Sequence, residues 1–472
     1  MLTVDHFLAS LSPNYQPGGR GPALENVVMD SREVKAGSLF VAYQGERADG
    51  HHYVADAFAQ GAVAALIEKP VSADFATIDM RSGTLPDSTS LTPPLCLLVD
   101  NTIAALQESA LAWRNQFDVT VIGVTGSVGK TSTKDLTHSV LTTAYRTFKS
   151  PGNRNSILGL PLALFDLRPH HQVAVLEMAM YTQGEIARLC ELTRPQIGVV
   201  TLIGPVHLER AGSMEAIVAA KQELVEALPA DGVAILNRDD ERVMGMADHT
   251  EARIFSYGLD ARADLWADNI HSMGLDGVRF TLHFQDEALS VHVPLLGRHS
   301  VHTALRATAV GLVKGLGWQE IVAGLRQLAA TQLRLVAVPG PAGSIIIDDT
   351  YNSSPDSAMA ALNLLEDLDG RHVAVVGDML ELGHLEEESH RLVGRRVADV
   401  ADLLVTVGQR AGWIADEALK VGMKPTMVHI MPDVETAVSL LESLIEPQDI
   451  ILIKASWGMR LDRMVAALGR DG

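Results

Sequence analysis

Short apolar segments alternate with longer amphipathic segments along most of this 472-residue chain. Such alternation predicts α/β units in which helices connect parallel strands. Strands are predicted at residues 118–125, 173–177, 197–203 and 233–237, and again in the segments "SIIIDD", "HVAVVGD", "LLVTVG" and "DIILIKAS". Residues 278–294 alternate instead with period two, which predicts an antiparallel hairpin beside the parallel sheet.

The pattern divides the chain into three predicted domains, 1–115, 116–335 and 336–472. The first contains the strand-like segments "GSLFVAYQG" and "AVAALIEK" and a loop at 81–95 rich in Ser, Thr and Pro, which we expect to be exposed. The second begins with the strand before a glycine-rich turn. The third follows the turn "VPGPAG" at 338–343.

Composition and charge narrow the class of protein. A formal charge of −20 disfavours a broad electrostatic grip on nucleic acid or anionic membrane, so bound phosphate would need local groups. The two cysteines, Cys96 and Cys190, fit a reducing compartment. We see no secretion signal and no apolar run near the roughly 20 residues of a membrane span. A cytoplasmic protein is therefore expected.

The segment "VTGSVGKTST", residues 124–133, lies between a predicted strand and a predicted helix that starts at Lys130. Val124 occupies a position where a strict Walker A loop has glycine, so the loop has the variant form T-G-x-x-G-K-[ST]. Backbone N–H groups of such a turn and the following helix N-terminus favour phosphate. Lys130 would then reach the β and γ phosphates, and Thr131 would hold magnesium. The alternative is an ordinary strand–turn–helix corner.

Several segments resemble one family in the order in which that family has them. "GVTGSVGKTSTKD" resembles the ATP loop of the Mur ligases, which build the peptide of bacterial peptidoglycan. The family's UDP-binding N-terminal domain resembles "DSREVKAGSLFVAYQGERADGHHYVADAFAQGA". Its central motifs resemble "GNRNSILGLPLALF", "VLEMAMYTQGEIA", "VHLERAGSMEAIVAAKQELV" and "NRDD". Two further segments, "IDDTYNSSPDSAMAALNLL" and "VVGDMLELG", resemble the MurF type in particular.

This resemblance implies three α/β domains, with a central P-loop-type parallel-sheet ATPase domain and a Rossmann-like C-terminal domain. It implies an ADP-forming ligase that joins D-alanyl-D-alanine to UDP-N-acetylmuramoyl-tripeptide through an acyl phosphate. ATP and magnesium are the implied cofactors, and a monomer is the implied state. The alternatives are a MurE-type ligase, which adds the third amino acid, a folate-polyglutamate ligase, which the UDP-binding first domain argues against, and a degenerate ATP-binding partner protein.

The resemblance also assigns roles to single residues. The implied catalytic residues are Lys130, Glu177, His207 and Lys221, and the implied metal ligands are Thr131, Glu177, His207 and a carbamylated Lys221. Without the family, Glu177 would be a helix cap, His207 a loop histidine and Lys221 a surface lysine. Carbamylation needs a neutral amine, which desolvation and neighbouring cations favour.

Nucleotide and substrate contacts are assigned in the same way. The implied ATP-binding residues are Thr125, Gly126, Ser127, Val128, Gly129, Lys130, Thr131, Ser132, His299, Arg334, Asp349, Tyr351 and Asn352. The implied substrate-binding residues are Asp30, Ser31, Arg32, Gly45, Glu46, Arg47, Asn153 and Asn155. An isolated Asp-Ser-Arg would otherwise be a simple turn, and "GNRNS" a polar loop.

The chain departs from the family pattern at several positions. "HSVHTALRA" stands where the family commonly has "HNVYNALAA", so Ser300 and Thr303 replace two asparagines expected near the adenine. Ala455 and Trp457 in "KASWGMR" replace a glycine and an arginine. Leu333 and Ile157 replace a glycine and an acidic residue. None of these changes affects Lys130, Glu177, His207 or Lys221.

Overall fold

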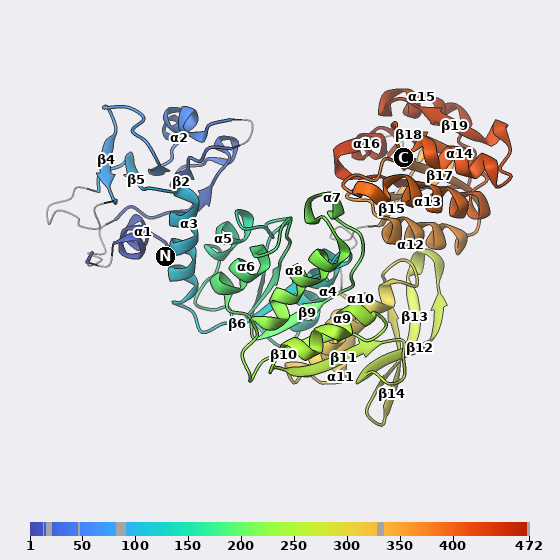
Figure 1. Cartoon of the computed structure of the whole chain (residues 1–472), viewed down its shortest axis with the longest axis horizontal. Helices are drawn as coiled ribbons and strands as arrows, with labels where there is room; N and C mark the ends of the chain where they lie inside the picture. The colour runs from blue at the N-terminus through green and yellow to red at the C-terminus, as the bar shows by residue number, and fades with distance from the viewer. Residues whose placement is uncertain (13, 16–20, 46–47, 82–90, 328–334, 470–472) are drawn as a thin grey trace. The chain divides into compact units, whose positions relative to one another are not determined.

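The structure is a computed structural model that describes residues 1–12, 14–15, 21–45, 48–81, 91–327 and 335–469 (Figure 1). The described chain divides into two compact units. The first comprises residues 1–121, 146–178 and 187–195, and the second comprises 122–145, 179–186 and 196–472. Within these described parts, no helix is long and apolar enough to cross a bilayer.

The first unit contains a parallel sheet in the order β1-β2-β3-β5-β4. Its strands are β1 (Asn26–Val28), β2 (Ser38–Val41), β3 (Ala64–Ile67), β4 (Ala76–Asp79) and β5 (Leu95–Leu98). The helices nearby in sequence are α1 (Val4–Leu11), α2 (Val54–Ala59) and α3 (Thr102–Arg114). β2, β3 and β5 are buried along their whole length, as expected for strands covered on both faces.

The same unit contains a second, shorter pair of parallel strands, β7 (Thr147–Lys149) and β8 (Val173–Glu177). Helix α5 (Gly159–Leu164) lies between them in sequence, and α6 (Glu185–Thr193) follows β8. Every residue of β8 is buried, which confirms the strand predicted at residues 173–177.

In the second unit, strands follow one another in the order β14-β13-β12-β11-β10-β9-β6. They are β6 (Thr120–Thr125), β9 (Ile197–Val200), β10 (Val233–Asn237), β11 (Arg253–Gly258), β12 (Leu265–Ser272), β13 (Val278–Phe284) and β14 (Glu287–Val293). The neighbouring strands β6, β9, β10, β11 and β12 pair in parallel, in that order. β13 and β14 form the predicted antiparallel hairpin, which continues the sheet through β12.

Helices of this central sheet are α4 (Lys130–Leu141), α7 (Leu208–Ala211), α8 (Met214–Glu226), α9 (Glu241–Met244), α10 (Ser300–Val313) and α11 (Trp318–Arg326). α4 packs closely on α11, because a Cβ on Gly324 would lie 2.4 Å from the Cα of Val140. Ser139 Oγ also donates a hydrogen bond to the carbonyl of Gly324. This packing fixes the helix that begins at the glycine loop.

The C-terminal sheet has the order β15-β16-β20-β17-β18-β19, and only β15 is antiparallel to its neighbour. Its strands are β15 (Val336–Pro339), β16 (Ile345–Asp349), β17 (Arg371–Gly377), β18 (Leu403–Val407), β19 (Val428–Met431) and β20 (Asp449–Lys454). The four strands predicted in this block are confirmed. β15 and β19 were not predicted, since each has only four residues and none of them is fully buried.

Helices cover both faces of this C-terminal sheet (Figure 1). They are α12 (Pro355–Glu366), α13 (Glu386–Val400), α14 (Gly412–Lys420), α15 (Val434–Leu444) and α16 (Asp462–Leu468). Alternate residues of one strand face opposite cores: Ile347 packs with α12, α13 and α14, whereas Ile346 packs with α15 and α16. This doubly covered sheet is the Rossmann-like architecture that the family resemblance implies for the C-terminal domain.

Candidate functional site

The glycine loop joins the end of β6 to the start of α4, as the sequence predicts. Gly126 has φ +137° and Gly129 has φ +86°, backbone angles that residues other than glycine rarely adopt. A Cβ on Gly126 would lie only 1.8 Å from Thr201 Oγ1. Thr201 Oγ1 in turn donates to the carbonyl of Val128 at 2.7 Å. The loop conformation therefore depends on glycine and on a neighbour 75 residues away in sequence.

Two further contacts fix the loop to the segment after β9. The Ser127 amide donates to the carbonyl of Leu202 at 2.8 Å. Ser127 Oγ donates to the carbonyl of Gly204 and accepts from its amide, both at 2.9 Å. Lys130 Nζ donates to the carbonyls of Gly126 at 2.8 Å and Ser127 at 3.3 Å, so its ammonium lies over the loop. A cation at this position, above the N-terminus of α4, is suited to bound phosphate.

Lys221 is another predicted catalytic residue in the second unit. It lies on α8 and is only 2% exposed, which contradicts the alternative of a surface lysine. Burial, and next the positive charge of Lys130, lower the pKa of Lys221 well below its usual range. Both effects favour the neutral amine that carbamylation requires.

His207 lies at the N-terminus of α7 in a left-handed backbone conformation with φ +61°. Its Nδ1 pairs with Glu381 Oε2, and the ring of Tyr181 meets the imidazole edge-on at 5.2 Å. Burial is the largest effect on the imidazole and lowers the pKa of His207, although Glu381 opposes this change. With a carboxylate on Nδ1, the other ring nitrogen is oriented as metal-ligating histidines commonly are.

A cavity of about 260 Å³ adjoins the loop in the second unit. The predicted nucleotide residues in its lining are Ser127, Val128, Gly129, Ser132, His299, Asp349 and Asn352. Sequence reasoning missed other residues of the same wall: Asn237, His302, Arg306, Ser354, Asp356, Ser357 and Lys454. Arg306 and Lys454 belong to the segments "HSVHTALRA" and "KASWGMR", whose resemblance to family motifs is the sequence signal that could identify them.

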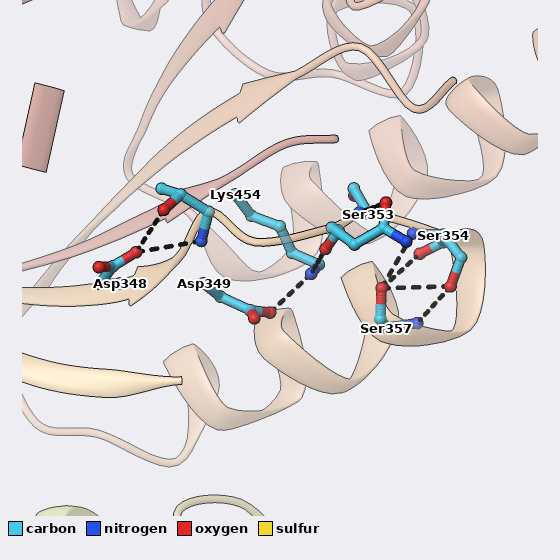
Figure 2. A network of polar contacts seen from close by, with 8 residues as sticks. Asp348, Asp349, Ser353, Ser354, Ser357 and Lys454 are labelled. Atoms are coloured by element: carbon cyan, nitrogen blue, oxygen red, sulfur yellow. Dashed lines mark hydrogen bonds and ion pairs between the residues drawn. The ribbon is translucent and has the colours of Figure 1, made fainter. Parts of the chain in front are cut away.

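The part of the cavity wall contributed by the C-terminal sheet is held by a polar network (Figure 2). Lys454 Nζ donates to Asp349 Oδ2 at 2.6 Å and to the carbonyl of Asn352 at 2.8 Å. Asp348 accepts from the amide and hydroxyl of Thr350 at 3.0 and 2.7 Å. These contacts fix the turn that follows β16 and thereby the position of Asn352.

The same network continues into the first turn of α12. Ser354 caps this helix by exchanging hydrogen bonds with Ser357, as Figure 2 shows. Both serines line the cavity.

His299 precedes α10 and lines this cavity with a side chain that is exposed to solvent. Desolvation by the surrounding protein atoms, followed by the nearby charges of Lys454, His302 and Arg306, lowers the pKa of His299 to about 4. At neutral pH the imidazole is therefore uncharged. It gives the cavity a neutral ring rather than a cation.

Glu177 and Asn155 lie together in the first unit. Glu177 ends β8 and is 1% exposed. Its Oε1 accepts from Asn155 Nδ2 at 2.8 Å, and its amide donates to Ser150 Oγ at 3.2 Å. A carboxylate this deeply buried is not the solvated helix cap of the alternative reading. Asn153 is exposed in the preceding loop. The metal-ligand role of Glu177 stays a prediction.

The predicted uridine-binding triplet also belongs to the first unit. Asp30 accepts from the amide and Nε of Arg32, both at 2.9 Å, and this arrangement forms a local turn. The hydrogen bond from the Arg32 side chain lowers the pKa of Asp30 to about 2. Gly45 donates its amide to the carbonyl of Ala48. Glu46, Arg47, Leu333 and Arg334 lie outside the described residues.

Two of the departures from the family pattern are prominent in the structure. Trp457 is 53% exposed, with its ring centroid 5.8 Å from that of Tyr351 and the guanidinium of Arg460 over its face. Ser300 Oγ donates to the carbonyl of Leu296, in the loop before α10, at 2.6 Å. The Ser300 hydroxyl therefore already donates its hydrogen bond within the protein.

Comparison with known protein families finds three matches along the chain. Residues 23–86 match the model described as Mur ligase family, catalytic domain. Residues 124–311 match the Mur ligase middle domain, and residues 333–457 match the Mur ligase, glutamate ligase domain.

Individual relatives match over nearly the full length. The UDP-N-acetylmuramoyl-tripeptide–D-alanyl-D-alanine ligase of Bacillus subtilis is 36% identical over 94% of this chain and 93% of its own. The ligase of the same name from Escherichia coli is 34% identical over 96% of each chain.

Solved structures agree in fold. A crystal structure of MurF from Acinetobacter baumannii has a TM-score of 0.84 and 29% identity, and the match covers 99% of this chain and 98% of that one. The MurF ligase of Thermotoga maritima, solved in complex with ADP, has a TM-score of 0.78 and 26% identity, with 94% and 97% coverage. These matches confirm the predicted fold class of three α/β domains.

Proposed function

The chain belongs to the Mur ligase family, and on that premise we propose that the cavity beside its glycine loop binds the ATP that this ligase consumes. One observation carries the proposal. The glycine loop and the turn after β16 line a single cavity, although more than 200 residues separate them in sequence. A nucleotide bound there would contact both, and its phosphates would lie at Lys130 and the N-terminus of α4.

The reaction is the joining of D-alanyl-D-alanine to UDP-N-acetylmuramoyl-tripeptide. A carboxylate oxygen of the tripeptide attacks the γ-phosphorus of ATP, and the bond to the bridging oxygen breaks to release ADP. The amine of D-alanyl-D-alanine then attacks the carbonyl carbon of the acyl phosphate. The C–O bond breaks, inorganic phosphate leaves, and the amine loses a proton. Lys130 would neutralise charge on the phosphates during the first step.

Magnesium fits the donor groups of the second unit. A buried neutral amine can add carbon dioxide and lose a proton to become a carbamate, which supplies oxygen, and His207 is already oriented by Glu381. We propose Thr131, His207 and carbamylated Lys221 as ligands, and Glu177 as a further ligand on the strength of the resemblance. When bound, the ion would neutralise phosphate oxygens and the reacting carboxylate.

The remaining assignments rest on the resemblance and on composition. We propose that Asp30, Ser31, Arg32, Gly45, Glu46, Arg47, Asn153 and Asn155 contact the UDP-linked substrate, and that Arg334 and Tyr351 contact the nucleotide. We propose domain limits at 1–115, 116–335 and 336–472. We also propose a monomer that works in the cytoplasm, where cysteines that form no disulfide, such as Cys96 and Cys190, are stable.

The test is phosphate release from ATP with magnesium and UDP-N-acetylmuramoyl-tripeptide, with and without D-alanyl-D-alanine. We expect release that depends on the dipeptide and a UDP-pentapeptide product. Release only with the UDP-dipeptide substrate plus diaminopimelate or lysine would indicate a MurE-type ligase instead. Nucleotide binding with no release in either assay would indicate a protein without ligase activity.

A further inference from the structure

Trp457 is an exposed aromatic side chain at the carboxyl end of the C-terminal sheet. It lies in the turn that follows β20 and is 53% exposed. Its ring centroid lies 5.8 Å from that of Tyr351, which follows the neighbouring parallel strand β16 and is 37% exposed. The two rings therefore form an open apolar surface at the edge where sheets of this kind bind ligands.

The turn that carries Trp457 is held by the loop that follows β17. The amide of Ser456 donates to the carbonyl of Asp378 at 3.1 Å, and the amide of Leu380 donates to Ser456 Oγ at 2.9 Å. On the other side of Trp457, a Cβ on Gly458 would lie 3.1 Å from Leu380 Cδ1. Because the backbone on both sides is held, the indole is presented to solvent from a fixed position.

Arg460 brings a cation to the same surface. Its guanidinium lies 5.4 Å from the centroid of the Trp457 ring. Its Nε and Nη2 donate to the carboxylate of Asp462 at 3.1 and 3.2 Å, in a pair that is largely exposed and contributes little stability. Among the described residues, Nη1 of Arg460 has no hydrogen-bond partner. The guanidinium can therefore bind a second carboxylate.

This surface adjoins the nucleotide cavity. Asn352, the residue after Tyr351, lines the cavity, and so does Lys454 at the end of β20. Trp457 and Arg460 are not among the described residues of that lining. A ligand on the indole would therefore lie beside the nucleotide, on the side of the cavity that the C-terminal sheet provides.

Two of the three substrates of the proposed reaction have other predicted sites. The nucleotide is assigned to the cavity, and the predicted contacts of the UDP-linked substrate lie in the first unit. The remaining substrate, D-alanyl-D-alanine, carries two methyl side chains and a terminal carboxylate. Methyl groups match the face of an indole, and a carboxylate matches a guanidinium.

We propose that Trp457 and Arg460 bind the acceptor dipeptide, with the indole on its methyl groups and the guanidinium on its carboxylate. Trp457 stands where the family commonly has arginine, so in this chain an apolar face takes the place of a cation. The inference rests on the proposed function, because it assigns a site to one substrate of that reaction.

The experiment measures KM for D-alanyl-D-alanine and for its C-terminal amide in the phosphate-release assay, with ATP, magnesium and UDP-N-acetylmuramoyl-tripeptide saturating. For the natural chain we expect a KM about tenfold higher for the amide, which lacks the charge that Arg460 binds. Arg460→Gln should raise the KM for the acid by about tenfold and make acid and amide equivalent. Arg463→Gln is the matched control, because its guanidinium pairs with Glu435 at an exposed position, and it should keep the natural ratio.

A second set of variants tests the indole. Trp457→Ala removes the apolar face and should raise the KM for both acceptors by about tenfold, with the KM for ATP unchanged. Trp457→Phe keeps an aromatic face and should recover most of this loss. Ile430→Ala, which changes another exposed apolar side chain of the same sheet, is the control and should leave every KM unchanged. Melting curves of each variant identify losses that come from unfolding.

Three results would overturn the proposal. The first is equal use of acid and amide by the natural chain, or an undiminished preference for the acid in Arg460→Gln. The second is an unchanged acceptor KM in Trp457→Ala. The third is a rise in the KM for ATP alone in that variant, which would place the indole at the nucleotide. All three leave the proposed function intact, whereas a natural chain without dipeptide-dependent phosphate release would refute the proposed function and this inference with it.

Discussion

The two sides of the nucleotide cavity are held in different ways. The glycine loop is held mainly through backbone groups: glycines at positive φ, the Ser127 amide on the carbonyl of Leu202 and a close approach to Thr201, with the Ser127 hydroxyl bonded to the backbone of Gly204. The turn after β16 is held by side chains, above all the buried ion pair of Lys454 and Asp349 (Figure 2). A side chain added to the glycine loop should therefore disturb its conformation. On the turn after β16, the loss of the Lys454 charge should instead lower stability.

The largest effect should come from removing the charge on the second side. Lys454→Met leaves Asp349 buried without its cation, and we expect a loss of about 3–5 kcal/mol in the free energy of unfolding. Urea unfolding, followed by hydrogen exchange in β16 and β20, measures it. The matched control is Lys420→Met, whose ammonium is exposed beside Glu417 and should contribute less than about 1 kcal/mol. Equal losses in the two variants would show that the buried pair is not what holds this turn.

On the first side, the corresponding change adds one methyl group. Gly126→Ala cannot keep φ +137° beside Thr201, so the loop must shift, and kcat/KM for ATP should fall about 100-fold. Gly245→Ala is the control, because no heavy atom lies within 4 Å of its added Cβ and its φ is −59°. Activity within threefold of the natural chain in Gly126→Ala would mean that the loop is not held by this contact.

A pH effect should come from His299, which precedes α10 and lines the same cavity. His299 has a folded pKa of about 4, below its unfolded value of about 6.5, so between these values the unfolded state binds more protons. Stability from this group is complete above pH 6.5 and is lost as the pH falls toward 4. Because the side chain is exposed, solvent screening keeps this loss small.

Urea unfolding between pH 4 and 7 tests this expectation. His299→Gln should show a shallower loss of stability on acidification than the natural chain. His271→Gln, an exposed histidine in β12, serves as control. Parallel curves for the natural chain and His299→Gln would contradict the assignment.

The smallest effect should come from the contact between His207 and Glu381. Glu381→Gln weakens the orientation of His207, and we expect about a tenfold increase in the magnesium concentration needed for half-maximal activity. Glu387→Gln, on the exposed face of α13, is the control. An unchanged magnesium dependence would separate Glu381 from the metal.

The sequence by itself determined the α/β class, the glycine loop and the start of α4 at Lys130. These features follow from local patterns: alternation of apolar segments, glycines at a strand end and the hairpin periodicity of residues 278–294. The resemblance to the family added Lys221 and His207, which no local pattern distinguishes from an ordinary helix lysine and loop histidine.

The tertiary structure alone decided which distant groups share the cavity wall. Arg306 is a helix residue by sequence, and only the packing of α10 against the glycine loop makes it a buried cation beside Gly129. Lys454 ends a strand, and only the pairing of β20 with β16 brings it to Asp349. The reason is physical: burial and charge partners are set by residues far apart in the chain, and these set the free energy and pKa of each group.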